Sequence, residues 1–202
     1  MENENDIKIR ILNSAREEFF LHGFTKVTVD EIASKLGMSK KTIYKFYPSK
    51  DDIVRAVITT TFKEVQSVCE EIVNNNTLNF VDKLQQMMTV AALHISKIGK
   101  SLIEDLQKNV PHVWNEVSEF RSKRINENFS KLLNEGVQKG IFRNDIDQQL
   151  VLLIYDNVIS NLVNPVMLAN LPFTASQVFE AIVKVIFEGI MTDKAKSQRV
   201  QK

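Results

Sequence analysis

The sequence lacks the residues that would support a disulfide-bonded, membrane-bound or secreted protein. Its one cysteine, Cys69, excludes a disulfide within the chain and is typical of a reducing cytosol. Its longest apolar runs are too short to cross a membrane, so we expect no membrane partner. The first six residues are polar and acidic, unlike a signal peptide. These absences predict a cytoplasmic protein.

The sequence also lacks a pattern that favours catalysis. His22, His94 and His112 fall in different predicted elements, without the spacing of metal ligands. The six glycines form no phosphate-binding loop, and Ser101 and Cys69 have no visible base partner. We therefore expect no enzymatic activity, no cofactor and no metal.

What the sequence does contain is helical periodicity along its whole length, with no convincing strand, which predicts an all-α fold. Its 202 residues are 44% hydrophobic and 25% charged, and they suffice for one small and one medium domain. We expect a head over residues 1–49 and a helical body over residues 50–202. A long helix that begins at Lys50 would belong to both.

The head contains a predicted helix, tight turn and second helix. Thr28 and Glu31 have the spacing of a capping box, which begins the first helix. Gly37 follows its last apolar residue and suits the left-handed conformation at a helix end. Ser39 is a good N-cap for the second helix. That arrangement is a helix-turn-helix, the motif that places its second helix in the major groove of duplex DNA.

The second helix, residues 40–47, has a basic and aromatic outer face and ends before Pro48. Ile43 and Tyr47 should face inward. The stretch from Lys26 to Lys50 has a net charge of +4, whereas the whole chain has +1. An ordinary solvated lysine face is the alternative. The residues expected on the outer face are Lys40, Lys41, Tyr44 and Lys45, with Thr42 at its edge.

The run from Thr28 to Ile53 resembles the signature of TetR-family transcriptional regulators, and residues 7–24 match that family's first helix. The resemblance covers about a quarter of the chain. It implies that Thr28 contacts a phosphate, that Lys50 clamps a phosphate, and that the second helix reads bases or backbone. The DNA-binding set is therefore Thr28, Ser39, Lys40, Lys41, Thr42, Tyr44, Lys45, Tyr47 and Lys50.

Two positions depart from the family pattern. Phe46 stands where the family often carries a histidine, and it cannot donate a hydrogen bond. Lys45 stands where an aromatic residue is common, which shifts that contact toward phosphate. The base contact at Phe46 is the one that this departure puts in doubt.

The two last long helices are apolar over more than one stripe, so each needs a second surface to cover it. A second copy of the chain is the simplest partner, because a helix-turn-helix protein reads two half-sites as a dimer. Burial within one subunit is the alternative. Asp145 with Gln148, and Thr174 with Gln177, should cap these helices. The predicted dimer interface consists of Leu152, Ile159, Val163, Phe179, Ile182, Val183, Ile186 and Phe187.

The resemblance also implies a small-molecule effector, bound in the body, that tilts the helix beginning at Lys50. The body contains bulky aromatic residues, methionines and a few polar groups, which suit an adaptable apolar pocket and equally suit a helical core. Asp156 and Asn157 are unusual inside an apolar helix, because buried polar groups need partners. A DNA-binding scaffold whose body binds a partner protein is the other function considered. The predicted pocket residues are Met87, Met88, His94, Trp114, Phe120, Phe129, Tyr155 and Asn157.

Overall fold

The structure is a computed structural model that describes residues 3–194 and 196, without the side chains of Val81 and Val183. Over these residues it contains helices and one isolated β-bridge, which confirms the all-α prediction. No described helix is both long and apolar enough to cross a membrane. The helices are α1 (Glu4–His22), α2 (Val29–Leu36), α3 (Lys40–Phe46), α4 (Lys50–Asn74), α5 (Phe80–Ile95), α6 (Lys100–Asn109), α7 (Pro111–Gln138), α8 (Gln148–Leu162), α9 (Pro165–Leu168), α10 (Ala175–Ile182), the π-helical η1 (Val183–Phe187) and α11 (Glu188–Ile190).

The chain forms two compact units, each assembled from separate stretches of sequence. Unit 1 consists of residues 1–64 and 97–120, and unit 2 of residues 65–96 and 121–202. Unit 1 therefore holds the helix-turn-helix together with the first part of α4, all of α6 and the first turns of α7. The functional division between residues 49 and 50 stays a prediction.

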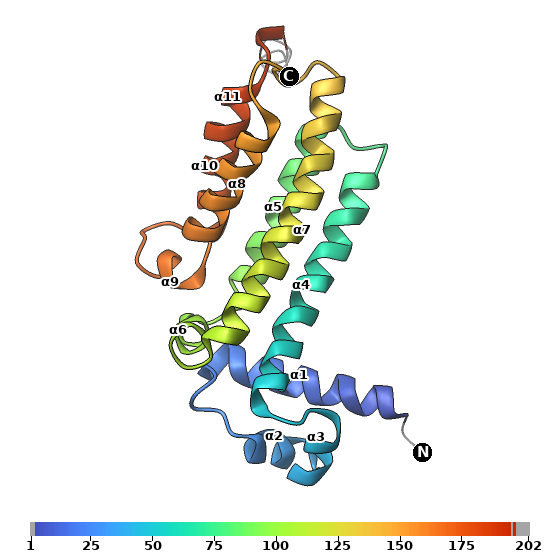
Figure 1. Cartoon of the computed structure of the whole chain (residues 1–202), viewed down its shortest axis with the longest axis vertical. Coiled ribbons are helices and arrows are strands. Elements are labelled where there is room, and N and C mark those ends of the chain that lie inside the picture. The colour runs from blue at the N-terminus through green and yellow to red at the C-terminus, as the bar shows by residue number, and fades with distance from the viewer. Residues whose placement is uncertain (1–2, 195, 197–202) are drawn as a thin grey trace. The chain divides into compact units, whose positions relative to one another are not determined.

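Unit 1 is organised around a single apolar core that α1 to α3 share with α4, α6 and α7. Figure 1 traces these helices along the chain. Ile11 and Phe19 of α1, Ile32 of α2 and Ile43 of α3 are each fully buried in it. Helix α4 contributes Ile53, one turn after its first residue. Helix α3 is thus fixed through Ile43 in a core to which its neighbouring helices contribute, which leaves its outer face exposed.

Helix α6 is held close to the end of α1. The N–H of Gly99, the N-cap of α6, donates to the carbonyl oxygen of Phe20 at 3.1 Å. A Cβ atom at Gly99 would lie 2.4 Å from that oxygen, so only glycine permits the approach. The carboxylate of Asp105 accepts from the N–H of Thr25 at 2.7 Å, and Asn109 donates to the Thr25 hydroxyl at 2.9 Å. These bonds fix the loop between α1 and α2, and with it the start of α2.

Unit 2 has an aromatic core. Phe129 of α7 stacks on Tyr155 of α8, with ring centroids 4.0 Å apart. Phe187 meets Phe129 edge-on at 5.2 Å, and Phe80 meets Phe142 edge-on at 4.7 Å. Such pairs contribute beyond the burial of their area. Burial raises the pKa of the Tyr155 phenol, so its ring is neutral and acts in packing.

Two of the predicted helix starts in unit 2 can be compared with the structure. Thr174 and Gln177 form the expected reciprocal cap before α10. The predicted cap by Asp145 is wrong. Asp147 is the residue immediately before α8, and its carboxylate accepts from the N–H groups of Gln149 and Leu150, whereas Asp145 pairs with Arg143.

Candidate nucleic-acid interface

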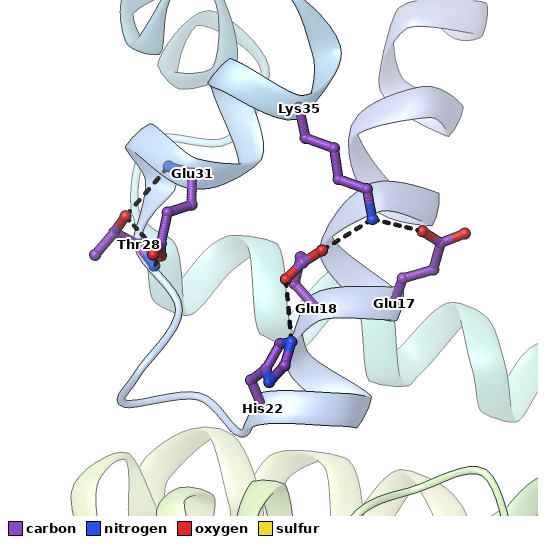
Figure 2. A network of polar contacts seen from close by, with 6 residues as sticks. All are labelled: Glu17, Glu18, His22, Thr28, Glu31 and Lys35. Carbon is purple, nitrogen blue, oxygen red and sulfur yellow. Dashed lines mark hydrogen bonds and ion pairs between the residues drawn. The ribbon is translucent and has the colours of Figure 1, made fainter.

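The start of α2 is fixed by the capping box that the sequence predicts. The Thr28 hydroxyl oxygen accepts from the N–H of Glu31 at 3.2 Å, and the Glu31 carboxylate accepts from the N–H of Thr28 at 2.7 Å (Figure 2). The Thr28 hydroxyl also donates to that carboxylate at 2.9 Å. These bonds from Thr28 lower the pKa of Glu31. The hydroxyl proton of Thr28 is therefore already engaged before any phosphate arrives.

The turn between α2 and α3 has the predicted geometry. Gly37 is left-handed, with φ 64° and ψ 29°, and Ser39 caps α3 by accepting from the N–H of Thr42 at 3.0 Å. The hydroxyl oxygens of Ser39 and Thr42 are 2.8 Å apart and share a hydrogen bond. Ser39 is thus a structural cap. Thr42 is partly buried at the edge of the outer face, as expected.

Helix α3 has a buried side and an exposed side. Ile43 is fully buried, and Phe46 and Tyr47 are partly buried against the same core. Burial raises the pKa of Tyr47. Tyr44 is 38% exposed and Lys41 is exposed on the other side. The head's own core therefore accounts for Phe46, and Tyr47 lies inward as the sequence predicts.

Two lysines of α3 already have acidic partners within the protein. The Lys40 ammonium lies 2.7 Å from the Asp30 carboxylate on α2. The Lys45 ammonium lies 2.9 Å from the Glu4 carboxylate at the start of α1. Among the described residues, Lys41 is the α3 lysine without such a partner. Glu4 and Asp30 were missed by sequence reasoning, because nothing in their spacing relates them to α3.

Lys35 lies on the side of α2 that faces α1. Its ammonium lies 2.8 Å from both Glu17 and Glu18 of α1, and Glu18 also lies 3.7 Å from His22 (Figure 2). The hydrogen bonds to Glu17 and Glu18 raise the pKa of Lys35. Lys35 therefore joins α2 to α1, although the sequence counts it within the basic stretch.

Lys50 stands at the first position of α4. Its ammonium lies 4.2 Å from the centroid of the Phe24 ring, a cation–π distance. Burial lowers the pKa of Lys50, and Asp105, Asp51 and Glu31 oppose that shift. Because Lys50 stands at a helix N-terminus, the positive end of the α4 dipole lies beside its charge, and Ser49 caps this end by accepting from the N–H of Asp52 at 3.0 Å. That combination suits a phosphate.

Comparison with known proteins identifies the family. Residues 11–57 match the model of the bacterial regulatory proteins of the tetR family. The uncharacterized HTH-type transcriptional regulator YvaF of Bacillus subtilis (strain 168) is 31% identical over 170 residues, which span 83% of this chain and 87% of that protein. This chain belongs to the TetR family of transcriptional regulators.

One further relative and one solved structure are also similar to this TetR-family regulator. The HTH-type transcriptional repressor KstR2 of Mycobacterium tuberculosis is 23% identical over 150 residues, 73% of this chain and 74% of that one. A protein from Saccharomonospora viridis, solved in complex with choline, has the same fold with a TM-score of 0.69. It is 17% identical, and the match covers 93% of this chain and 99% of that chain.

The residues predicted for an effector pocket of this TetR-family regulator are distributed over both compact units. Trp114 and Phe120 belong to unit 1, whereas the other six belong to unit 2. Met88, Phe129 and Tyr155 are buried in the core of unit 2, and Met87 is partly buried against it. On α5, the partly buried His94 donates from Nδ1 to its own helix, to the carbonyl oxygen of Val90.

Asn157 is exposed on α8 and donates to the Leu153 carbonyl at 2.9 Å, so it does not line the interior of unit 2. Among the described residues, no cluster of histidine, cysteine or acidic side chains could hold a metal ion.

Most residues predicted for a dimer interface are in the core of their own subunit. Ile159, Val163, Phe179, Ile182 and Phe187 are buried, so they cannot form an outer surface. Leu152 and Ile186 are partly buried, and the side chain of Val183 lies outside the described residues. The exposed apolar side chains of the same segments are Leu150, Leu153, Ile154 and Leu162 of α8 and Val185 of η1.

Proposed function

We propose that this protein is a ligand-responsive repressor that binds a near-palindromic operator as a homodimer. The observation that carries the proposal is the exposed face of α3, with Lys41 and Tyr44 at its centre and Lys40 and Lys45 beside them. Cations and a phenol on a helix of this kind suit a groove between phosphate chains. Repression is supported by the similarity to a transcriptional repressor.

The homodimer is supported by an apolar surface on α8 and η1. Leu153 is 60% exposed and Val185 is 76% exposed, which is unusual for large apolar side chains in the last helices of a small domain. Two copies would also place two recognition helices at half-sites one turn of DNA apart. Light scattering after gel filtration should give twice 23.2 kDa, and Leu153→Glu should give a 23.2 kDa particle.

The release step would use a small, largely apolar effector bound in the body. An effector that changes the spacing of the two heads weakens binding, because both recognition helices must meet successive grooves at once. A protein with this fold was solved in complex with choline, which supports the binding of a small molecule by a protein of this kind. The alternative is a DNA-binding scaffold whose body binds a protein partner. Thermal melting against a compound library separates the two, since an effector that binds only the folded state raises its melting temperature.

The proposed DNA binding is tested by selecting bound duplexes from a randomised pool. A near-palindrome should be enriched. If no sequence is enriched, or if binding depends on the salt concentration but not on the DNA sequence, sequence-specific recognition is contradicted.

Lys50→Ala should weaken binding to all duplexes. It should also reduce the slope of log affinity against log salt concentration by about one, because one phosphate contact is lost. Substitution of Lys40 or Thr42 should instead change the preferred sequence, and a uniform loss would contradict a base-reading role.

A further inference from the structure

Arg121 of α7 has a guanidinium group with no hydrogen-bonding partner among the described residues. Its side chain is partly buried and its Nε atom is out of reach of solvent. Across the part of the chain that the structure describes, Arg121 makes neither a hydrogen bond nor an ion pair. Burial lowers the pKa of Arg121, and the charge of Asp156 partly opposes that shift. The Nε–H is therefore a buried donor without a partner, on a cation that burial disfavours, and perturbed groups of this kind cluster at binding sites.

Asp156 of α8 is the acidic group that faces Arg121, at more than ion-pair distance. Both of its carboxylate oxygens accept from the Ser122 hydroxyl, at 2.9 and 3.0 Å, which orients the carboxylate. Ser160 stands one turn further along the same face of α8, and its hydroxyl is buried without a partner among the described residues. Unit 2 therefore contains an unused donor on α7, and an anchored acceptor and an unpaired hydroxyl one turn apart on α8.

The charges of this group decide what it can bind. Arg121 and Asp156 together carry no net charge, and the neighbouring Arg124 is already paired with Glu127 at 2.8 Å. A bound carboxylate would leave one negative charge in excess beside Asp156, and a bound ammonium would leave one positive charge beside Arg121. A hydroxyl or a primary amide can accept a hydrogen bond from Arg121 and donate one to Asp156, and it adds no charge.

The surroundings of these polar groups are apolar. Tyr155 and Ile159, the residues next to Asp156 and Ser160 on α8, are both buried. Tyr155 stacks on Phe129 of α7 in the apolar core of unit 2, so this core adjoins Asp156 along α8. A ligand that reaches Arg121 and Asp156 would therefore carry an apolar body attached to its polar end.

We propose that Arg121, Asp156 and Ser160 form the polar end of an effector site that selects neutral molecules with a hydroxyl or amide on an apolar body. The proposal rests on the proposed function in one respect, namely that the body senses a small molecule. It names a ligand class, and none of the three polar residues that would select it is among the eight pocket residues predicted from the sequence.

The test compares three probes with the same chain length: octan-1-ol, octanamide and octanoate. Each is titrated into the full-length protein without DNA, and binding is followed by calorimetry and by the melting temperature. Octan-1-ol and octanamide should bind and raise the melting temperature, and octanoate should bind at least about tenfold more weakly. Absence of binding by every probe would overturn the proposal, and octanoate binding as tightly as octanamide would equally overturn it.

Charge-changing variants make the test specific. Asp156→Asn leaves the site with one net positive charge, so the order should invert and octanoate should bind more tightly than octanamide. Arg121→Gln leaves one negative charge, so octylammonium should become the preferred probe. Lys123→Gln removes an exposed cation from the same helix and should leave the wild-type order unchanged. An unchanged order in both site variants, each shown to be folded by circular dichroism, would overturn the proposal.

The outcome can be separated from that of the proposed function. Operator binding is measured without probes, and probe binding is measured without DNA. If the probes fail while a palindromic operator is selected, only the site assigned to Arg121 is wrong. If the probe order inverts as expected while no operator is selected, the site stands and the repressor proposal is wrong.

Discussion

Replacing Glu4 by Gln should strengthen DNA binding, although Glu4 lies at the start of α1 and not on the recognition helix. Its carboxylate lies 2.9 Å from the Lys45 ammonium, and hydrogen bonding to Lys45 lowers the pKa of Glu4, so the pair is charged at pH 7. A phosphate can use Lys45 fully only after this carboxylate is displaced. Removing the carboxylate's charge removes that competition.

The size of the effect follows from the exposure of the pair. The two side chains are 68% and 71% exposed, so water screens their attraction and the gain in affinity should be about two- to fivefold at low salt. It should shrink as salt approaches about 0.3 M, because the Debye length falls below about 10 Å above 0.1 M salt. Fluorescence anisotropy with the selected operator and a scrambled duplex would measure it.

Asp6→Asn is the matched control for this prediction. Asp6 lies in the same first turn of α1 and its loss changes the net charge equally, but the structure gives it no lysine partner among the described residues. Asp6→Asn should therefore have a smaller effect. In a Lys45→Gln background the gain from Glu4→Gln should disappear. Equal effects of the two substitutions, or a gain that persists without Lys45, would refute competition between Glu4 and phosphate.

Two predictions concern stability. Gly99→Ala should lower the free energy of unfolding, measured by urea denaturation, by about 2–4 kcal/mol, because the new methyl group would overlap the Phe20 carbonyl oxygen and break the hydrogen bond to it. The control is Gly189→Ala, which has open space around it and should be neutral or stabilising in the same assay. Hydrogen bonds from Lys139 and then Lys83 lower the pKa of Glu135. The folded pKa is below the unfolded one, so this contribution is present above about pH 4.5 and is lost as the pH falls through the folded pKa. The stability difference between wild type and Glu135→Gln should therefore shrink below that pH, and a constant difference would contradict the assignment.

The sequence by itself determined the features that depend on neighbours within about four residues. The cap formed by Thr28 and Glu31, the left-handed Gly37 and the cap at Ser39 are all set by groups on the same short stretch of chain. Local hydrogen bonds and backbone preferences are encoded by spacing alone, so the sequence was sufficient to predict the helix-turn-helix. The predicted cap of α8 is wrong by two residues, because several acidic residues there offer similar spacing.

Only the tertiary structure decided which side chains are available and which are already used. Lys45 has its partner 41 residues away, and Lys40 has its partner on another helix. The last helices are apolar on more than one side, so their sequence could not show which side meets the subunit's own core. Arg121 carries no sequence signal at all. Its significance comes from the absence of a partner within reach among the described residues, and that absence exists only once α7 and α8 have been brought together.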